Sequence, residues 1–262
     1  MKKMVIVGIV LFVLSFVVST SALAAIEVEG DAYVGIFDKY MWRGFDLSAA
    51  QPVAQGGVDL SAKGFTLSFW SNVQLSNGNS VSQEIDWLPS NEVTETDITL
   101  DYTHEFELVS VSVGDIFYNF NGAGASTHEL YLGLALNTIL SPTLTAYYDW
   151  DLSNDNTLND DGTKAYEGNG LYYTFGVSHS LDLMEKLSVD LGATVGYNDE
   201  SPYVSNTYTD WHNYELSVGA TYAVTDQISI SPSFLFSEGL SDKAKKNIDS
   251  DTVGGVTVTL TF

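Results

Sequence analysis

Residues 256–262, at the end of the chain, read Val-Thr-Val-Thr-Leu-Thr-Phe. In this segment apolar residues and threonines alternate strictly. In an extended strand successive side chains point to opposite faces, so this segment predicts a β-strand with one apolar and one polar face. Soluble proteins usually protect such an apolar edge strand from pairing with other chains. We therefore expect this strand to be closed into a barrel rather than left at the edge of a sheet.

The same two-residue period runs through the chain beyond residue 25. Apolar residues alternate with small or polar ones over 130–137 and 187–198, and no window of similar length carries a helical stripe. The pattern predicts an all-β chain with twelve strands. We expect them at residues 27–38, 51–62, 64–76, 94–108, 109–120, 127–140, 143–153, 170–181, 187–198, 211–224, 227–238 and 251–262.

The lengths of these segments indicate a membrane protein. Each expected strand holds 11 to 15 residues, whereas strands of soluble proteins cluster near about 5–6 residues and a tilted transmembrane strand needs about 9–11. Short connections, such as 62–64 and 225–227, alternate with long polar ones at 39–50, 77–93, 154–169, 199–210 and 239–250. This rhythm predicts a transmembrane antiparallel up-and-down β-barrel with short periplasmic turns and long extracellular loops.

The N-terminus predicts export from the cytoplasm. Lys2 and Lys3 precede an apolar run over residues 4–18, and Ala22-Leu23-Ala24 then offers a cleavage site of small residues. We predict a signal peptide at residues 1–24 and a mature barrel at residues 25–262. The expected destination, after passage through the periplasm, is the outer membrane of a Gram-negative bacterium.

Composition excludes several classes of function. The chain carries 34 Asp+Glu against 10 Lys+Arg and has no Cys, which gives a formal charge of −24. Such an acidic chain cannot neutralise phosphates, so we expect no nucleic-acid partner. The absence of Cys excludes thiolate metal sites. The acidic stretch 155–162 fails the EF-hand template, because the first ligand position of the template falls on Thr157 and its bidentate Glu position falls on Gly168. We expect no metal and no cofactor.

The polar faces of the strands predict an acidic lumen. If Ile98, Leu100 and Tyr102 face lipid, the residues between them face inward, and because charge facing hydrocarbon is costly we expect a water-filled interior. The pore-lining candidates are Asp59, Asp97, Asp101, Glu105, Glu129, Asp149, Asp151, Asp190 and Glu215. Rows of carboxylates favour cations. Alternatively, some of these acids pair with Arg43, Lys39 or Lys164, or hydrogen-bond across a plugged lumen.

The sequence leaves two functions open, and enzymatic activity is a third that we do not expect. The first is a porin-like channel for small cations or small solutes. The second is a non-conducting barrel with an adhesive or structural role through loops such as 77–93 and 199–210. Enzymatic activity is not expected: His212 beside Asp210 would be a candidate base, but no motif marks an activated serine.

The front of the chain resembles a known family. Tyr40-Met41-Trp42-Arg43-Gly44, Gln51-Pro52-Val53-Ala54-Gln55-Gly56-Gly57 and Trp70-Ser71-Asn72-Val73 are similar to motifs of the TorF family of porins, although Trp70 and Ser71 lack the usual intervening residue. The resemblance covers roughly residues 33–75 and implies an outer-membrane barrel that forms a diffusion pore, with no established substrate or catalytic residues.

Two further sets of residues complete the expected sites. Trp42 and Arg43 are pore-mouth candidates, where Arg43 either lies in the constriction or is a structural arginine paired with a neighbouring acid. The terminal Phe262, with Leu260 and Val258, resembles the signal that the barrel-insertion machinery reads. The expected partners are therefore outer-membrane lipid, the insertion machinery, and small cations or small solutes.

Overall fold

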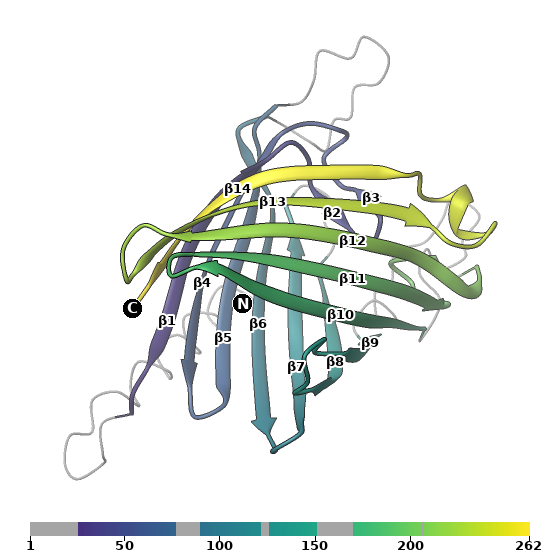
Figure 1. The fold of residues 1–262 in the computed structure, drawn as a ribbon. Helices are drawn as coiled ribbons and strands as arrows, with labels where there is room; N and C mark the ends of the chain where they lie inside the picture. Colours follow the sequence, from purple (N-terminus) through teal and green to yellow (C-terminus); the bar gives the residue numbers. More distant parts are fainter. Residues whose placement is uncertain (1–25, 77–89, 122–125, 151–169, 206) are drawn as a thin grey trace, which may run out of the picture.

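Twelve antiparallel strands form a closed barrel in the computed structural model, which describes residues 26–76, 90–121, 126–150, 170–205 and 207–262 (Figure 1). Each strand pairs with its neighbours along the chain, and β1 pairs with both β4 and β14. The strands are β1 (Glu29–Phe37), β4 (Val53–Ala62), β5 (Phe65–Gln74), β6 (Glu92–Glu105), β7 (Val109–Phe120), β8 (Ser126–Leu136), β9 (Thr143–Asp149), β10 (Leu171–Met184), β11 (Leu187–Asp199), β12 (Thr209–Ala223), β13 (Ile228–Gly239) and β14 (Asp251–Thr261).

The predicted fold class and the predicted twelve-strand count are confirmed. The period-two pattern located the strands because each contributes one apolar row to the same outer surface of the barrel. The described part of the chain contains no helix that is long and apolar enough to cross a membrane.

The last strand closes the barrel. β14 pairs with β1 from Asp31↔Thr261 to Phe37↔Gly255, and the backbones of Gly30 and Phe262 exchange two hydrogen bonds of 2.8 Å. The terminal strand therefore has a hydrogen-bonded neighbour on each side and presents no free edge. The side chains of the expected insertion signal are all exposed on the outer face: Val258, Leu260 and Phe262.

The outer surface of the barrel is apolar. In β8, Leu130, Leu132, Leu134 and Leu136 are between 42% and 53% exposed, and the other strands carry similar rows. A surface of this kind would be a liability in water, but it is the lipid-contacting surface of a transmembrane barrel. Closure is needed in the same environment, since hydrocarbon offers no partner for an unpaired backbone group.

Long and short connections lie at opposite ends of the barrel. We call these the long-loop end and the short-turn end; the short turns include 63–64 between β4 and β5 and 185–186 between β10 and β11. At the long-loop end, the connection between β13 and β14 contains a short 3-10 helix, η2 (Ala244–Lys246).

A small hairpin at the long-loop end has no counterpart among the predicted strands. Within the connection 38–52, β2 (Met41–Trp42) pairs with β3 (Phe45–Asp46) around Arg43 and Gly44. Both turn residues have positive φ, 49° and 83°, as a two-residue type I′ turn requires. The connection 38–52 is called the inserted hairpin below, because its side chains contact the inner wall of the barrel.

Candidate functional site

Eight of the nine pore-lining candidates lie on the inward face of their strands. Asp59, for example, lies between the exposed Val58 and Leu60, and Glu215 precedes the exposed Leu216. The ninth candidate, Asp151, lies outside the described residues. A role of these acids in conduction stays a prediction.

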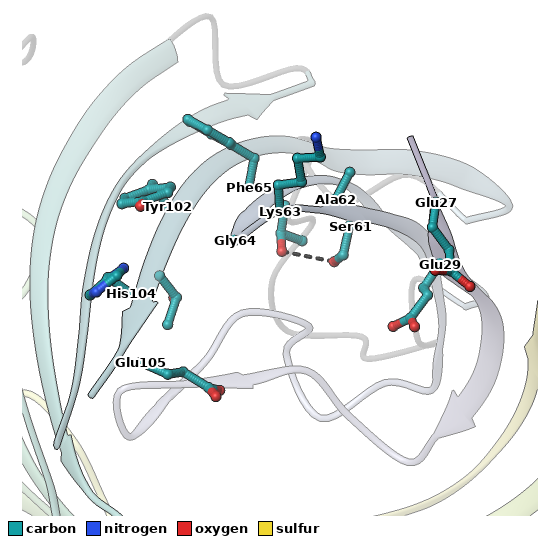
Figure 2. Close-up of a pocket in the computed structure, with 12 residues that line it drawn as sticks. Glu27, Glu29, Ser61, Ala62, Lys63, Gly64, Phe65, Tyr102, His104 and Glu105 are labelled. Atoms are coloured by element: carbon teal, nitrogen blue, oxygen red, sulfur yellow. Dashed lines mark hydrogen bonds between the residues drawn. The ribbon is translucent and has the colours of Figure 1, made fainter. Parts of the chain in front are cut away.

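The short-turn end holds a cavity of about 770 Å³ at the lumen mouth. Glu27 and Glu29 border it before and at the start of β1, Lys63 on the β4–β5 turn, and Glu105 at the end of β6. Figure 2 shows the carboxylates of Glu29 and Glu105 reaching into this space from opposite sides. A cation entering here meets more carboxylates than ammonium groups.

Deeper in the lumen, Asp101 is held by hydroxyl groups rather than by a basic residue. The Tyr131 hydroxyl donates a 2.5 Å hydrogen bond to one carboxylate oxygen, and the Thr103 hydroxyl donates one of 2.8 Å to the other. Such bonds orient the carboxylate without cancelling its charge.

The long-loop half of the lumen is packed. Polar side chains that are at most 3% exposed gather here: Ser48, Asn72, Gln74, Glu95, Thr127, Glu129, Asp149, Asn198, Ser201, His212, Asn213 and Ser237. Tyr118, Tyr172 and Tyr208 are buried among them. Buried polar groups require hydrogen-bond partners, and the inserted hairpin supplies several of these, such as the Ser48 carbonyl that accepts from Gln74.

Arg43, at the tip of the inserted hairpin, contacts the opposite wall. Its guanidinium donates two hydrogen bonds to the Glu129 carboxylate, of 2.9 and 2.8 Å. The same group lies over the rings of Trp42, Tyr147 and Tyr172, at 4.3, 4.7 and 4.3 Å from their centroids. A bidentate, charge-assisted pair together with cation–π contacts to three aromatic rings holds a guanidinium strongly.

The structure shows Arg43 paired with an acid, Glu129, which had been expected to line the pore. A place of Arg43 in the constriction of a pore stays a prediction. Glu129 also accepts a 3.0 Å hydrogen bond from the Tyr118 hydroxyl, and its side chain is only 1% exposed. Its charge is neutralised by Arg43, so Glu129 does not act as a free pore carboxylate in this structure.

His212 fixes the backbone of the inserted hairpin. Its Nε2 lies 2.9 Å from the Arg43 carbonyl, which can only accept, so Nε2 carries the hydrogen and Nδ1 accepts from the Tyr208 hydroxyl at 2.5 Å. The structure does not pair His212 with Asp210: both ring nitrogens of His212 have other partners, and Asp210 lies 3.7 Å from the Lys243 ammonium. His212 turned inward, towards a loop that sequence reasoning had not placed in the lumen.

A second ion pair holds the root of the inserted hairpin. The Lys39 ammonium donates a 2.5 Å hydrogen bond to Asp251, at the start of β14. The hydrogen bond to Asp251 raises the pKa of Lys39 against the opposing effect of partial burial, so Lys39 remains charged.

One polar cluster lies on the outer face, where sequence reasoning did not expect an acid. Asp115 of β7 contacts His128 Nδ1 at 2.7 Å and accepts a 2.9 Å hydrogen bond from the Trp150 indole. Asp115 shares the parity of the exposed Val113, which was a sufficient signal to find it. Its two partners satisfy a carboxylate that would be costly facing lipid alone.

Among the described residues, no three acidic or histidine side chains are grouped so as to hold a metal ion. The acidic stretch 155–162 lies outside the described residues, so the expectation of no metal there stays a prediction.

The closed barrel, its apolar outer face and its polar lumen define a transmembrane β-barrel, a fold that solved outer-membrane porins share. The chain belongs to a family described as "Bacterial protein of unknown function (Gcw_chp)", whose profile matches residues 21–261. No curated protein matches the chain significantly.

Two solved structures show the same fold. The NanC porin has a TM-score of 0.54 at 12% sequence identity, covering 88% of this chain and 98% of its own. The COG4313 outer membrane channel from Pseudomonas putida F1 has a TM-score of 0.50 at 12% identity, covering 94% of this chain and 98% of its own. At such identities the likeness concerns the fold.

Proposed function

We propose that this protein is an outer-membrane channel for the passive diffusion of small solutes or ions, and that its acidic lumen favours cations. The observation that carries the proposal is the separation of faces around a closed barrel. Apolar rows face outward, while acids such as Asp59, Asp101 and Asp190 face inward. A water-filled path is the environment in which these inward charges are stable.

The balance of charge supports cation preference. Among the described residues, Arg43 neutralises Glu129 and Lys39 neutralises Asp251, whereas no ion pair joins Asp59, Asp101 or Asp190 to a basic residue. Unneutralised carboxylates along a narrow path raise the local concentration of cations and repel anions. Twelve strands give a lumen between those of filled eight-stranded barrels and open sixteen-stranded porins.

The proposed location follows from the same features. We propose export through residues 1–24, insertion by the barrel-insertion machinery through the β14 end, and contact with outer-membrane lipid. N-terminal sequencing of the protein from isolated outer membranes tests this. We expect the chain to start at Ala25, and a fraction found in the inner membrane would contradict the location.

We also infer that the chain is a porin of the TorF type. The glycines of the motif that carries this resemblance have a clear role in the barrel, because a Cβ on Gly57 would lie 2.4 Å from the Phe69 carbonyl oxygen and 2.6 Å from the Tyr33 hydroxyl. Only glycine allows this approach.

The packed long-loop half favours a second candidate, a non-conducting barrel with an adhesive or structural role. The loop 199–210 was a candidate for binding an external partner, but the ring of its Tyr203 has its centroid within 6.4 Å of those of Trp42, Tyr118 and Phe120. Its inward position leaves less of this loop for adhesion.

Conductance of the purified protein in planar bilayers separates the two candidates. Heat-modifiable migration in detergent first shows that the barrel is folded. We then expect discrete current steps. A folded barrel that inserts and gives no steps would refute the channel and leave the structural role.

A further inference from the structure

We propose that the lumen wall around Glu129 is a binding site for small solutes that carry a guanidinium group, and that Arg43 occupies it as a tethered ligand. We call the wall residues Tyr118, Glu129, Tyr147 and Tyr172 the Glu129 site. The inference rests on the proposed function, because it names a class of solute for the channel.

The wall supplies the whole recognition surface without the inserted hairpin. The four residues come from β7, β8, β9 and β10, which are consecutive neighbours in the barrel. Glu129 offers both carboxylate oxygens to one guanidinium, and Tyr147 and Tyr172 offer ring faces to it. A carboxylate fork combined with aromatic faces is the chemistry that recognises a planar delocalised cation.

Wall contacts also hold these side chains in place. The Tyr118 hydroxyl donates to Glu129, and the Tyr172 hydroxyl donates a 2.9 Å hydrogen bond to Asn213 of β12. Thr127, two residues before Glu129, donates to Asp149, which is the register partner of Glu129 on β9. Because none of these bonds involves Arg43, we expect the site to stay assembled when Arg43 leaves it.

The backbone of Arg43 is strained in the conformation that places its side chain in the Glu129 site. Arg43 has φ 49°, in the left-handed region that costs a residue with a side chain free energy. This conformation persists because Glu129, the aromatic rings and His212 hold the tip. A free guanidinium reaches the same contacts without backbone strain, so it can occupy the Glu129 site once the Arg43 side chain is removed.

The chemistry of the site selects between cations. An ammonium group is a compact charge that cannot form two parallel hydrogen bonds with a carboxylate, whereas a guanidinium does so by its shape. The inward acids attract both kinds of cation, so discrimination must come from the Glu129 site itself.

Calorimetric titration of the folded protein in detergent with ethylguanidinium tests the proposal. Arg43→Ala empties the site, and Lys243→Ala is the matched control because it removes an exposed charge at the long-loop end, paired with Asp210, and leaves Arg43 in place. We expect saturable binding by R43A, about tenfold weaker binding of ethylammonium, and no detectable binding by K243A. The double variant R43A/E129Q should lose the binding.

Several results would overturn the proposal: no saturable binding by R43A, equal binding of ethylammonium, or equal binding by K243A. If R43A does not fold, Arg43→Lys keeps the charge but cannot form the bidentate pair, and ethylguanidinium should then displace the lysine. R43K that folds and binds nothing refutes the site.

This titration requires no current and so distinguishes two failures. Binding in a protein that never conducts would refute the channel alone. Conduction in a protein whose R43A variant binds no ethylguanidinium would refute the Glu129 site alone.

Discussion

At the scale of single residues, the lumen is organised by one buried ion pair. The side chains of Arg43 and Glu129 are 9% and 1% exposed, and both have exchanged water for each other and for tyrosine rings and hydroxyls. Such a pair contributes little relative to an apolar replacement, but removing one partner leaves the other charge buried and uncompensated.

Glu129→Gln is therefore expected to lower the free energy of unfolding by about 3 kcal/mol, since the Arg43 guanidinium stays buried without its counter-charge. Urea unfolding of the barrel in detergent, followed by tryptophan fluorescence, measures this. Asp59→Asn is the matched control, because none of the basic residues that the structure describes pairs with Asp59, and we expect it to change the free energy by less than about 0.5 kcal/mol. Equal effects of the two variants would contradict the buried pair.

The partner of Arg43 could not be read from the sequence. Arg43 and Glu129 are 86 positions apart, and they meet only because the loop between β1 and β4 enters the lumen and reaches β8 on the opposite wall. Parity correctly placed Glu129 on the inward face, since that depends on its own strand. The ion pair between Arg43 and Glu129 depends instead on the path of the inserted hairpin. The periodicity of the strands does not predict this path.

At the scale of elements, the strands were predictable and the inserted hairpin was not. Each strand contributes an apolar row to a common lipid-facing surface, so its local pattern is sufficient to locate it. β2 and β3 have two residues each and pack against the inner wall through rings such as Phe45 on His212. Arg43-Gly44 is also outside the usual Asn-Gly and Asp-Gly signals for a type I′ turn.

The inserted hairpin is expected to restrict the channel, so loosening it should increase conductance. Gly44→Ala places a Cβ at φ 83° and 2.8 Å from Ile248, which the turn cannot accommodate without shifting. We expect larger single-channel steps in planar bilayers. Gly254→Ala, whose Cβ would meet its nearest atom at 3.9 Å, is the control and should leave the steps unchanged. Unchanged steps in G44A would show that the hairpin does not limit the path.

The two faces of a strand should respond differently to charge. Leu132→Arg puts a cation on the lipid face of β8 and is expected to lower the free energy of unfolding by about 2–4 kcal/mol near the bilayer midplane. Asp190→Arg places the same group on the inward face of β11, and we expect less than half this loss because the lumen is wet. Unfolding of both variants in lipid vesicles tests this, and similar losses would contradict the assignment of faces.

At the scale of the whole molecule, charge and hydropathy are divided between the surfaces of the barrel. The chain is only 17% charged yet carries 34 Asp+Glu. The uncharged outward rows explain the low charge content, and inward acids contribute to the excess. The short-turn end presents an acidic cavity, while the long-loop half is filled by the inserted hairpin and buried polar side chains.

The inward acids towards the short-turn end of the barrel should together determine which ions the channel prefers. We expect the triple variant Asp59→Asn, Asp101→Asn and Asp190→Asn to move the reversal potential in a salt gradient towards zero, since it removes three unneutralised carboxylates. Asp115→Asn is the control because Asp115 lies on the outer face with His128 and Trp150. If D115N has the same effect, selectivity does not arise from the lumen.

The reversal potential of the unmodified protein tests cation preference most directly. It is measured in planar bilayers across a tenfold gradient of potassium chloride, after heat-modifiable migration has shown that the barrel is folded. We expect discrete channel steps and a reversal potential of the sign given by potassium moving down its gradient. A potential of the opposite sign, directed by chloride, would contradict a channel governed by lumen carboxylates.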